Sequence, residues 1–291
     1  MRTSQALLRA LTPYTVGDLP LERWGPNAEG GYVVPSGLLS KATVLVTGGV
    51  SDDARFEAEV AANVSGIRIV LLDHTIDKPP DQTPLNAIWH KLGLGSAPGC
   101  ISLEAATAMS GAKPDDTLVM KIDIESAEWE LLESTPEEFW DRVAVLLLEM
   151  HGLDRKVEWG RYTTLLEKLN RHMLIVHLHG NNYARTALIE GMQVPMSIEA
   201  TYINRKLIPA GQPPVAWNHG APGSLDRRNN PEVIDIPFDF WMMKSPLIRI
   251  VTRIGLYVLP WRLRKNFCLN LTPKSMKRRN RIRAGTEEII T

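Results

Sequence analysis

Short apolar runs rich in β-branched residues alternate with segments of helical spacing along the first two thirds of the chain. Several of the runs carry no polar face, which is typical of parallel strands covered by helices on both sides. The predicted strands are residues 44–49, 67–75, 117–124, 143–152, 173–180 and 194–205. The predicted helices are residues 51–64, with Ser51 or Asp52 as N-cap, 103–111, 126–143 with an interruption near Pro136, and 160–172. The order of these elements predicts an α/β fold.

The last two predicted strands, 173–180 and 194–205, are joined by a segment too short for a crossover helix, so we expect them to be antiparallel. The sequence therefore predicts a Rossmann-like doubly wound sheet that is mostly parallel and has an antiparallel late strand. The alternation fades after residue 205. We predict one domain over residues 1–205 and a C-terminal extension over 206–291, made of a wrapping segment and a basic amphipathic part.

Composition and cysteine usage are those of an ordinary globular protein, with 44% hydrophobic and 23% charged residues. Cys100 and Cys268 have neither metal-ligand spacing nor disulfide density, and the N-terminus has no continuous apolar core of a signal peptide. We therefore expect a cytoplasmic protein.

Charge is uneven along the chain, although the formal net charge is +0. Twelve of the 33 Lys and Arg residues lie between Lys244 and Gly285, where there is no Asp or Glu. Such a segment is often only solvated surface, but it can also dock internally or on anionic lipid. The second interpretation predicts peripheral contact of residues 240–285 with the inner face of a membrane. Aromatic residues do not alternate with the basic ones, so we expect no nucleic-acid partner.

A glycine turn and an acid follow the first two predicted strands. Gly48 and Gly49 end the first strand, and Asp73 ends the second. In dinucleotide-binding folds such a turn lets a ligand approach the backbone closely, and the acid accepts hydrogen bonds from ribose hydroxyls. The complete GxGxxG pattern is absent, which suits a nucleoside cofactor without a pyrophosphate, such as S-adenosylmethionine. The alternative is a structural turn and a surface aspartate.

Asp123 and Glu125 follow the third predicted strand at a spacing of two, which directs both side chains to the same face. They can be a metal site, an acid/base pair, contacts to a cofactor's ammonium group, or acids that favour a helix start. There is no HExxH motif or close histidine cluster, so we predict no metal site. Glu128 is assigned to the helix start.

Histidines and asparagines end two later strands. His151 and His179 are candidate proton acceptors, with a structural role as the alternative for each. Asn181 and Asn182 can form hydrogen bonds with acceptor hydroxyls. With Glu125, they are the predicted substrate contacts.

Seven segments in order, spread over residues 22–205, resemble the FkbM-like class I methyltransferases, especially the branch with a GGYVV segment. The segments are ERWGPNAEGGYVV, GGVSDDARFE, LDHT, KIDIESAEWELL, EMHGL, HGNNY and SIEATYINR. The resemblance implies a class I methyltransferase sheet and S-adenosylmethionine as cofactor. It also implies O-methylation of a sugar, glycan or related natural product.

The resemblance assigns site residues by position. Gly48 and Gly49 match the cofactor loop, although the GxGxG of many methyltransferases is absent, and Ser126 replaces the family's usual glycine. The remaining assignments are Asp73 as the ribose-binding acid, His74 beside the adenine, Asp123 as the acid after the family's fourth strand, and Gly30, Gly31 and Tyr32 closing over the methionine end.

We therefore expect an S-adenosylmethionine-dependent O-methyltransferase that acts on a glycan or small-molecule hydroxyl. The first alternative is a non-catalytic or membrane-tethered binding protein on the same fold. A second is an NAD-dependent oxidoreductase, against which the missing GxGxxG argues.

Overall fold

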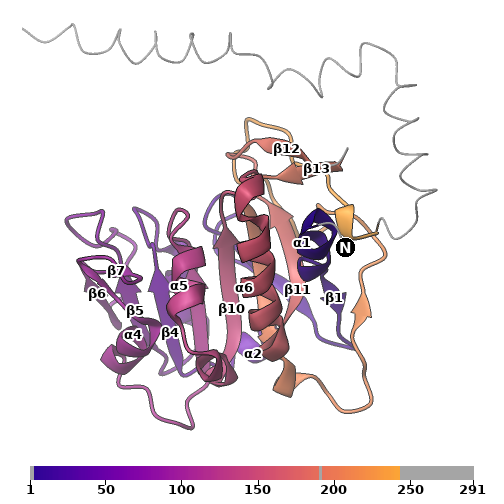
Figure 1. Cartoon of the computed structure of the whole chain (residues 1–291). Coiled ribbons are helices and arrows are strands. Elements are labelled where there is room, and N and C mark those ends of the chain that lie inside the picture. The colour runs from indigo at the N-terminus through magenta and orange to yellow at the C-terminus, as the bar shows by residue number, and fades with distance from the viewer. Residues whose placement is uncertain (1–2, 190–191, 243–291) are drawn as a thin grey trace, which may run out of the picture. The chain divides into compact units, whose positions relative to one another are not determined.

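A computed structural model of the chain describes residues 3–189 and 192–242. These residues belong to one compact unit that ends at Met242, and its centre is a seven-stranded sheet (Figure 1). The strand order is β11-β14-β10-β9-β4-β5-β6. The bounds are β4 Val44–Gly48, β5 Arg68–Leu72, β6 Ala87–His90, β9 Leu118–Ile122, β10 Val143–Met150, β11 Met173–Gly180 and β14 Ile198–Asn204.

The strand directions confirm the predicted doubly wound sheet, which is mostly parallel and has an antiparallel late strand. β4, β5, β6, β9 and β10 pair in parallel, while β14 pairs antiparallel with both β10 and β11. Every residue of β9, β10, β11 and β14 is buried, as expected for strands that are covered on both faces.

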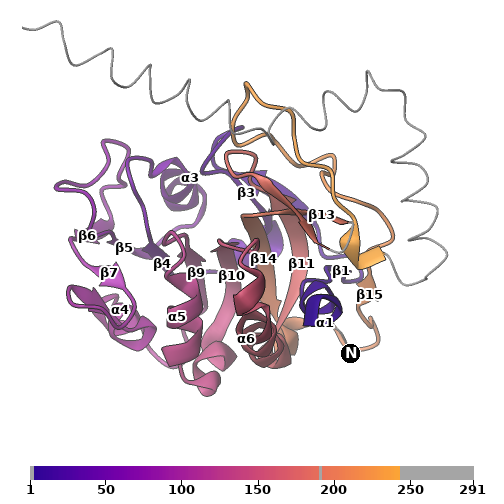
Figure 2. The ribbon, with the colours of Figure 1, turned by 45° about the horizontal axis from the view of Figure 1, so that its top comes forward.

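Helices cover both faces of the sheet. Figures 1 and 2 show α5, α6 and α1 on one face, and α3 and α2 on the other. The helix bounds are α1 Thr3–Ala10, α2 Ser36–Leu39, α3 Arg55–Asn63, α4 Leu103–Met109, α5 Glu128–Ser134 and α6 Trp159–His172. Short 3-10 helices are η1 Glu137–Arg142, η2 Lys156–Glu158, η3 Arg205–Leu207 and η4 Phe240–Met242. On the α3 face, Trp24, Tyr32, Leu39 and Phe56 pack with the sheet in one apolar cluster.

The start of α3 differs from the prediction. Its N-cap is Ala54, without a side-chain hydrogen bond, and not Ser51 or Asp52. Ser51 has φ 51°, and its N–H donates to the Asp73 carboxylate at 2.8 Å. The residues after β4 therefore form a turn held by β5 before the helix begins.

Several elements outside the predicted set position the site. The edge strand β6 is one, and two hairpins are the others: β2 (Leu21–Trp24) with β3 (Tyr32–Pro35), and β12 (Thr186–Ile189) with β13 (Met192–Pro195). Two further short pairs are β1 (Tyr14–Thr15) with β15 (Val215–Ala216) and β7 (Gly93–Leu94) with β8 (Cys100–Ile101).

The wrapping segment packs onto the sheet as far as Met242, so the compact unit is longer than the predicted domain over 1–205. Asp226 and Asp235 from this segment pair with His177 and His179 of β11 at 3.0 Å each. The predicted basic amphipathic part, 240–285, lies almost wholly outside the described residues. Within residues 3–189 and 192–242, every helix is too short or too polar to cross a membrane.

Position 49 requires a glycine because the backbone of Asp123 comes very close to it. Its φ is +78°, and a Cβ built there would lie 1.7 Å from the carbonyl oxygen of Asp123. We expect Gly49→Ala to lower the free energy of unfolding by about 3 kcal/mol or more, since left-handed strain and overlap with the backbone add. Urea denaturation measures this loss.

Gly66 is the matched control, because its φ is +74° and an added Cβ would meet nothing within 4 Å. Gly66→Ala should cost only the conformational strain, about 1–2 kcal/mol. Equal losses in the two variants would show that the Asp123 carbonyl does not constrain Gly49.

Candidate functional site

Two cavities lie at the carboxyl ends of β4, β5 and β9, where ligands bind in open α/β sheets. Gly49, Ser51, Asp123 and Glu125 line both of them. We call them the apolar cavity (≈ 550 Å³) and the acidic cavity (≈ 410 Å³). Because they share a wall, one extended ligand can occupy both.

The apolar cavity is formed by the ends of β4 and β5 together with β7 and β8. Leu72, Leu94 and Ile124 supply apolar surface, and Asp73 and His74 supply polar groups. The cavity also carries further polar side chains, from Ser51, Thr75, Ser96, Asp123, Glu125 and Glu130. It therefore combines apolar surface with several polar contacts, which suits a polar small molecule.

Asp73 is 5% exposed, and its carboxylate already holds two loops. Oδ2 accepts the Ser51 N–H at 2.8 Å, and Oδ1 accepts the N–H and hydroxyl of Thr75 at 2.7 and 2.6 Å. A carboxylate has about four acceptor positions, so these bonds leave room for a ligand hydroxyl on Oδ2.

The predicted glycine pair also contacts the protein's own chain. A Cβ on Gly48 would lie 2.3 Å from Leu94 Cδ1, and Gly48 lines neither cavity. Gly49 lines both. The close approach expected at this turn is therefore made by Leu94 and the Asp123 carbonyl, and only Gly49 faces the ligand space.

Carboxylates dominate the acidic cavity. Its acidic lining residues are Glu29, Asp52, Asp53, Asp123, Glu125 and Glu149, and its basic ones are Lys121 and His151. Burial and repulsion from Glu199 and Asp123 raise the pKa of Glu29 to about 7. Burial and neighbouring acids raise the pKa of Glu149 well above its usual range. The cavity therefore favours positively charged ligands.

Lys121 and Glu149 were missed from the sequence because each lies inside an apolar run. Lys121 is 4% exposed, 3.4 Å from Glu57 Oε1, and its Nζ lies 5.4 Å from the centroid of the Tyr32 ring. One feature of the sequence could have revealed Lys121. It lies two residues before Asp123 and four before Glu125, so in an extended strand all three side chains point to the same face.

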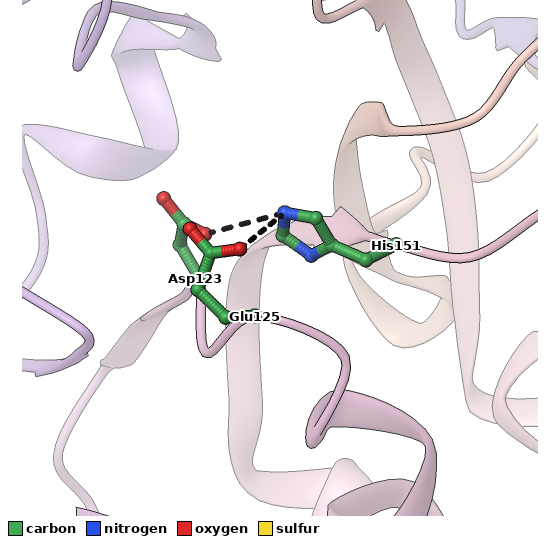
Figure 3. A group of neighbouring side chains, drawn as sticks. All are labelled: Asp123, Glu125 and His151. Carbon is green, nitrogen blue, oxygen red and sulfur yellow. Dashed lines mark ion pairs between the residues drawn. The ribbon is translucent and has the colours of Figure 1, made fainter. Parts of the chain in front are cut away.

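His151 follows β10 and directs its ring at the shared wall (Figure 3). Its Nε2 lies 3.4 Å from Glu149 Oε1, 3.6 Å from Glu125 Oε2 and 4.0 Å from Asp123 Oδ1. Burial lowers the pKa of His151, but the Glu128 carboxylate and the other acids raise it by more. The imidazole is thus placed to accept a proton inside the acidic cavity.

Glu128 does more than start a helix. It is the first residue of α5, but its side chain is fully buried and its Oε1 accepts the backbone N–H of His151 at 2.6 Å. The same oxygen lies 3.3 Å from His151 Nδ1. Glu128 therefore helps to orient His151.

His179 does not line either cavity, contrary to its predicted role as a proton acceptor. Its Nδ1 lies 3.2 Å from Glu199 Oε2, and its Nε2 lies 3.0 Å from Asp235 Oδ1. Burial lowers the pKa of His179, but the hydrogen bonds to Asp235 and Glu199 raise it by more, to about 10. His179 is therefore a buried cation that ties the wrapping segment to β11, and we keep only His151 as the candidate base.

The two predicted asparagines point in different directions. Asn181 lines the acidic cavity and donates to Glu149 Oε1 at 2.9 Å. Asn182 is 5% exposed, lines neither cavity, and donates to the carbonyls of Asn230 and Val233. Asn182, which was predicted to contact the substrate, is thus placed as a structural contact away from both cavities.

The N-terminal glycine segment reaches the acidic cavity in part. Gly30 and Tyr32 line it, whereas Gly31 does not. A Cβ on Gly31 would lie 2.0 Å from the Pro26 carbonyl oxygen, so the glycine serves the tight β2–β3 loop.

Strained backbone conformations occur at and next to the wall that the two cavities share. Among the described residues, the non-glycine residues with positive φ are Ser51 (51°), Glu125 (52°) and Ser126 (81°). Such strain costs about 1–3 kcal/mol per residue and is typical of functional sites. A glycine would adopt the φ of Ser126 without this strain.

No family model matches the chain, and no curated protein matches it. Among solved structures, the chain is similar to a precorrin-6y C5,15-methyltransferase from Geobacter metallireducens GS-15, with a TM-score of 0.32 and 12% identity over 58% of this chain and 87% of that chain. It is also similar to a Methanococcus jannaschii fibrillarin pre-rRNA processing protein, with a TM-score of 0.36 and 13% identity over 65% of this chain and 84% of that chain. Likeness at this level does not assign an activity, so the function has to come from the cavities.

Proposed function

We propose that the protein transfers a methyl group from S-adenosylmethionine to a hydroxyl of a sugar, glycan or related natural product. The observation that carries this proposal is the pair of adjoining cavities at the carboxyl edge of a class I methyltransferase sheet, with Asp123 and Glu125 in their common wall. The FkbM-like sequence segments support the same activity.

The apolar cavity suits the adenosine part of the cofactor. Asp73 Oδ2 offers an acceptor to a ribose hydroxyl, while Leu72 and Leu94 offer apolar contact to the base. His74 is exposed and lines the same cavity, in agreement with its assigned place beside adenine.

The wall that the two cavities share suits the positively charged end of the cofactor. Bound S-adenosylmethionine supplies a methyl group on a positively charged sulfur, together with an ammonium group. Asp123 and Glu125 place carboxyl groups where the two cavities meet, and Glu29 and Glu149 lie beside them in the acidic cavity. Carboxylates at this position stabilise a cationic cofactor.

The acidic cavity would hold the acceptor. His151 Nε2 would take the proton from the acceptor hydroxyl as the hydroxyl oxygen bonded to the methyl carbon and the carbon–sulfur electron pair stayed on sulfur. The remaining work of the protein is to align the reacting atoms. Asn181 lies beside His151 in the cavity, and Tyr183, 62% exposed, offers an aromatic face to the apolar side of a sugar ring.

Isothermal titration with S-adenosylhomocysteine, the demethylated product, tests the proposal. The folded protein should bind one equivalent. Absence of binding by protein with intact near-ultraviolet circular dichroism would reject the proposed activity and leave a binding protein on the same fold.

A further inference from the structure

Three carboxylates from separate parts of the chain converge in the acidic cavity. Glu29 lies in the β2–β3 loop, Asp123 follows β9 and Glu149 lies in β10. One oxygen of each lies within 4.8 Å of the others. Side chains this close, on different elements, can share a single ion.

The surrounding protein holds these carboxylates and offsets their charge only in part, since Lys121 and His151 are the basic residues that line the cavity. The Asn181 amide donates to Glu149 Oε1 at 2.9 Å and to Glu29 Oε2 at 3.5 Å, and Ser197 Oγ donates to Glu149 Oε1 at 2.5 Å. Carboxylates that bind a metal usually accept hydrogen bonds from neighbouring protein groups in this way. Lys121 is paired with Glu57 at 3.4 Å. Carboxylates held this closely repel one another, and a divalent cation among them would offset that repulsion.

The Tyr32 hydroxyl gives an independent sign of a ligand. Tyr32 is 5% exposed and lines the acidic cavity, and no residue in the described part of the chain forms a hydrogen bond with its hydroxyl. The hydroxyl oxygen is not among the fully buried atoms, so it is open to the cavity, from which it can take a partner. A water or hydroxyl bound to an ion in the cavity would supply it.

A second group, Asp123, Glu125 and His151, also meets the distance condition (Figure 3). Glu125 is 89% exposed on its side chain, and the ring of His151 is oriented by Glu128. The all-oxygen group of Glu29, Asp123 and Glu149 is the more buried, and its ligand type suits a hard divalent cation.

We propose that Glu29, Asp123 and Glu149 bind a divalent cation such as Mg²⁺ or Mn²⁺. Its open coordination positions face the acidic cavity. Its role in catalysis rests on the proposed methyl transfer: the ion would bind the acceptor hydroxyl and favour its ionised form beside His151. Binding of the ion itself does not depend on that function.

Titration of the full-length protein with MnCl₂, followed by electron paramagnetic resonance of free Mn²⁺, tests the site. We expect one bound ion, displaced by Mg²⁺. Glu149→Gln should weaken binding by about 10-fold or more, because it removes a charged ligand. Glu29→Gln, in a half-buried loop, gives the same test if the first variant does not fold. Glu138→Gln, on an exposed residue outside the cavity, should leave binding unchanged.

Repeating the titration with saturating S-adenosylhomocysteine separates an ion from the cofactor's ammonium group. Retained Mn²⁺ binding supports the ion site, while mutual exclusion assigns the carboxylates to the ammonium group and overturns it. Absence of Mn²⁺ binding, or equal binding by wild type and both folded variants, also overturns it. If S-adenosylhomocysteine fails to bind while Mn²⁺ binds, the proposed function fails and the ion site stands.

Discussion

Asp73→Asn is expected to weaken binding of S-adenosylhomocysteine by about 10- to 100-fold, since hydrogen bonds to a charged group contribute about 1.5–3 kcal/mol each. The carboxylate accepts the Ser51 N–H and two donors of Thr75, and it lines the apolar cavity. An asparagine keeps the shape but replaces one acceptor oxygen by a donor NH₂. It loses both the ribose contact and a bond that orders the loop. Isothermal titration measures the change.

Asp77→Asn is the matched control, because the Asp77 side chain is 95% exposed and its partner among the described residues is Lys91 at the surface. It should bind S-adenosylhomocysteine as the wild type does. If Asp73→Asn is folded and keeps wild-type affinity, Asp73 does not contact the ribose.

His151→Asn should lower the rate of methyl transfer by about 10²- to 10⁴-fold, the usual contribution of a general base. Its Nε2 lies among Glu149, Glu125 and Asp123 at the shared wall. Cofactor binding should stay within a few fold, because His151 does not line the apolar cavity. The measurement is single-turnover transfer of a radiolabelled methyl group to an acceptor identified from a panel of sugars and glycans.

His172→Asn is the control, since His172 pairs with Asp141 and Glu137 away from both cavities. Its rate should equal that of the wild type. A His151→Asn protein that transfers methyl at the wild-type rate would place the base elsewhere.

The strands of the sheet were predictable where burial on both faces leaves a run that is apolar at all positions but one, as in β9 and β10. The edge strand β6 was missed because it is only partly buried and reads as a loop. The helix start at Arg55 was missed because Ser51, a good N-cap type, is held by Asp73 in a turn. Tertiary contacts of this kind override local preference.

The residues of the candidate site that directly follow a strand were predictable from the sequence. Asp73, Asp123 and His151 all follow strands and line the cavities. Lys121 and Glu149 lie inside strands, where a charge is unexpected until its partners are known.

His151 and His179 could not be separated by sequence position, because both end strands. In the sheet, His179 lies opposite Glu199 of the antiparallel strand β14 and also meets Asp235 of the wrapping segment. Asn181 and Asn182 are adjacent, yet they face opposite sides of a turn. Only the folded arrangement brings these partners together.

A crystal structure of the protein with S-adenosylhomocysteine tests the central claim most directly. We expect the adenosine in the apolar cavity with a ribose hydroxyl on Asp73, and the sulfur at the wall of Asp123 and Glu125, turned towards His151. Adenosine bound outside the apolar cavity, or a sulfur turned away from the acidic cavity, would contradict the proposed methyl transfer.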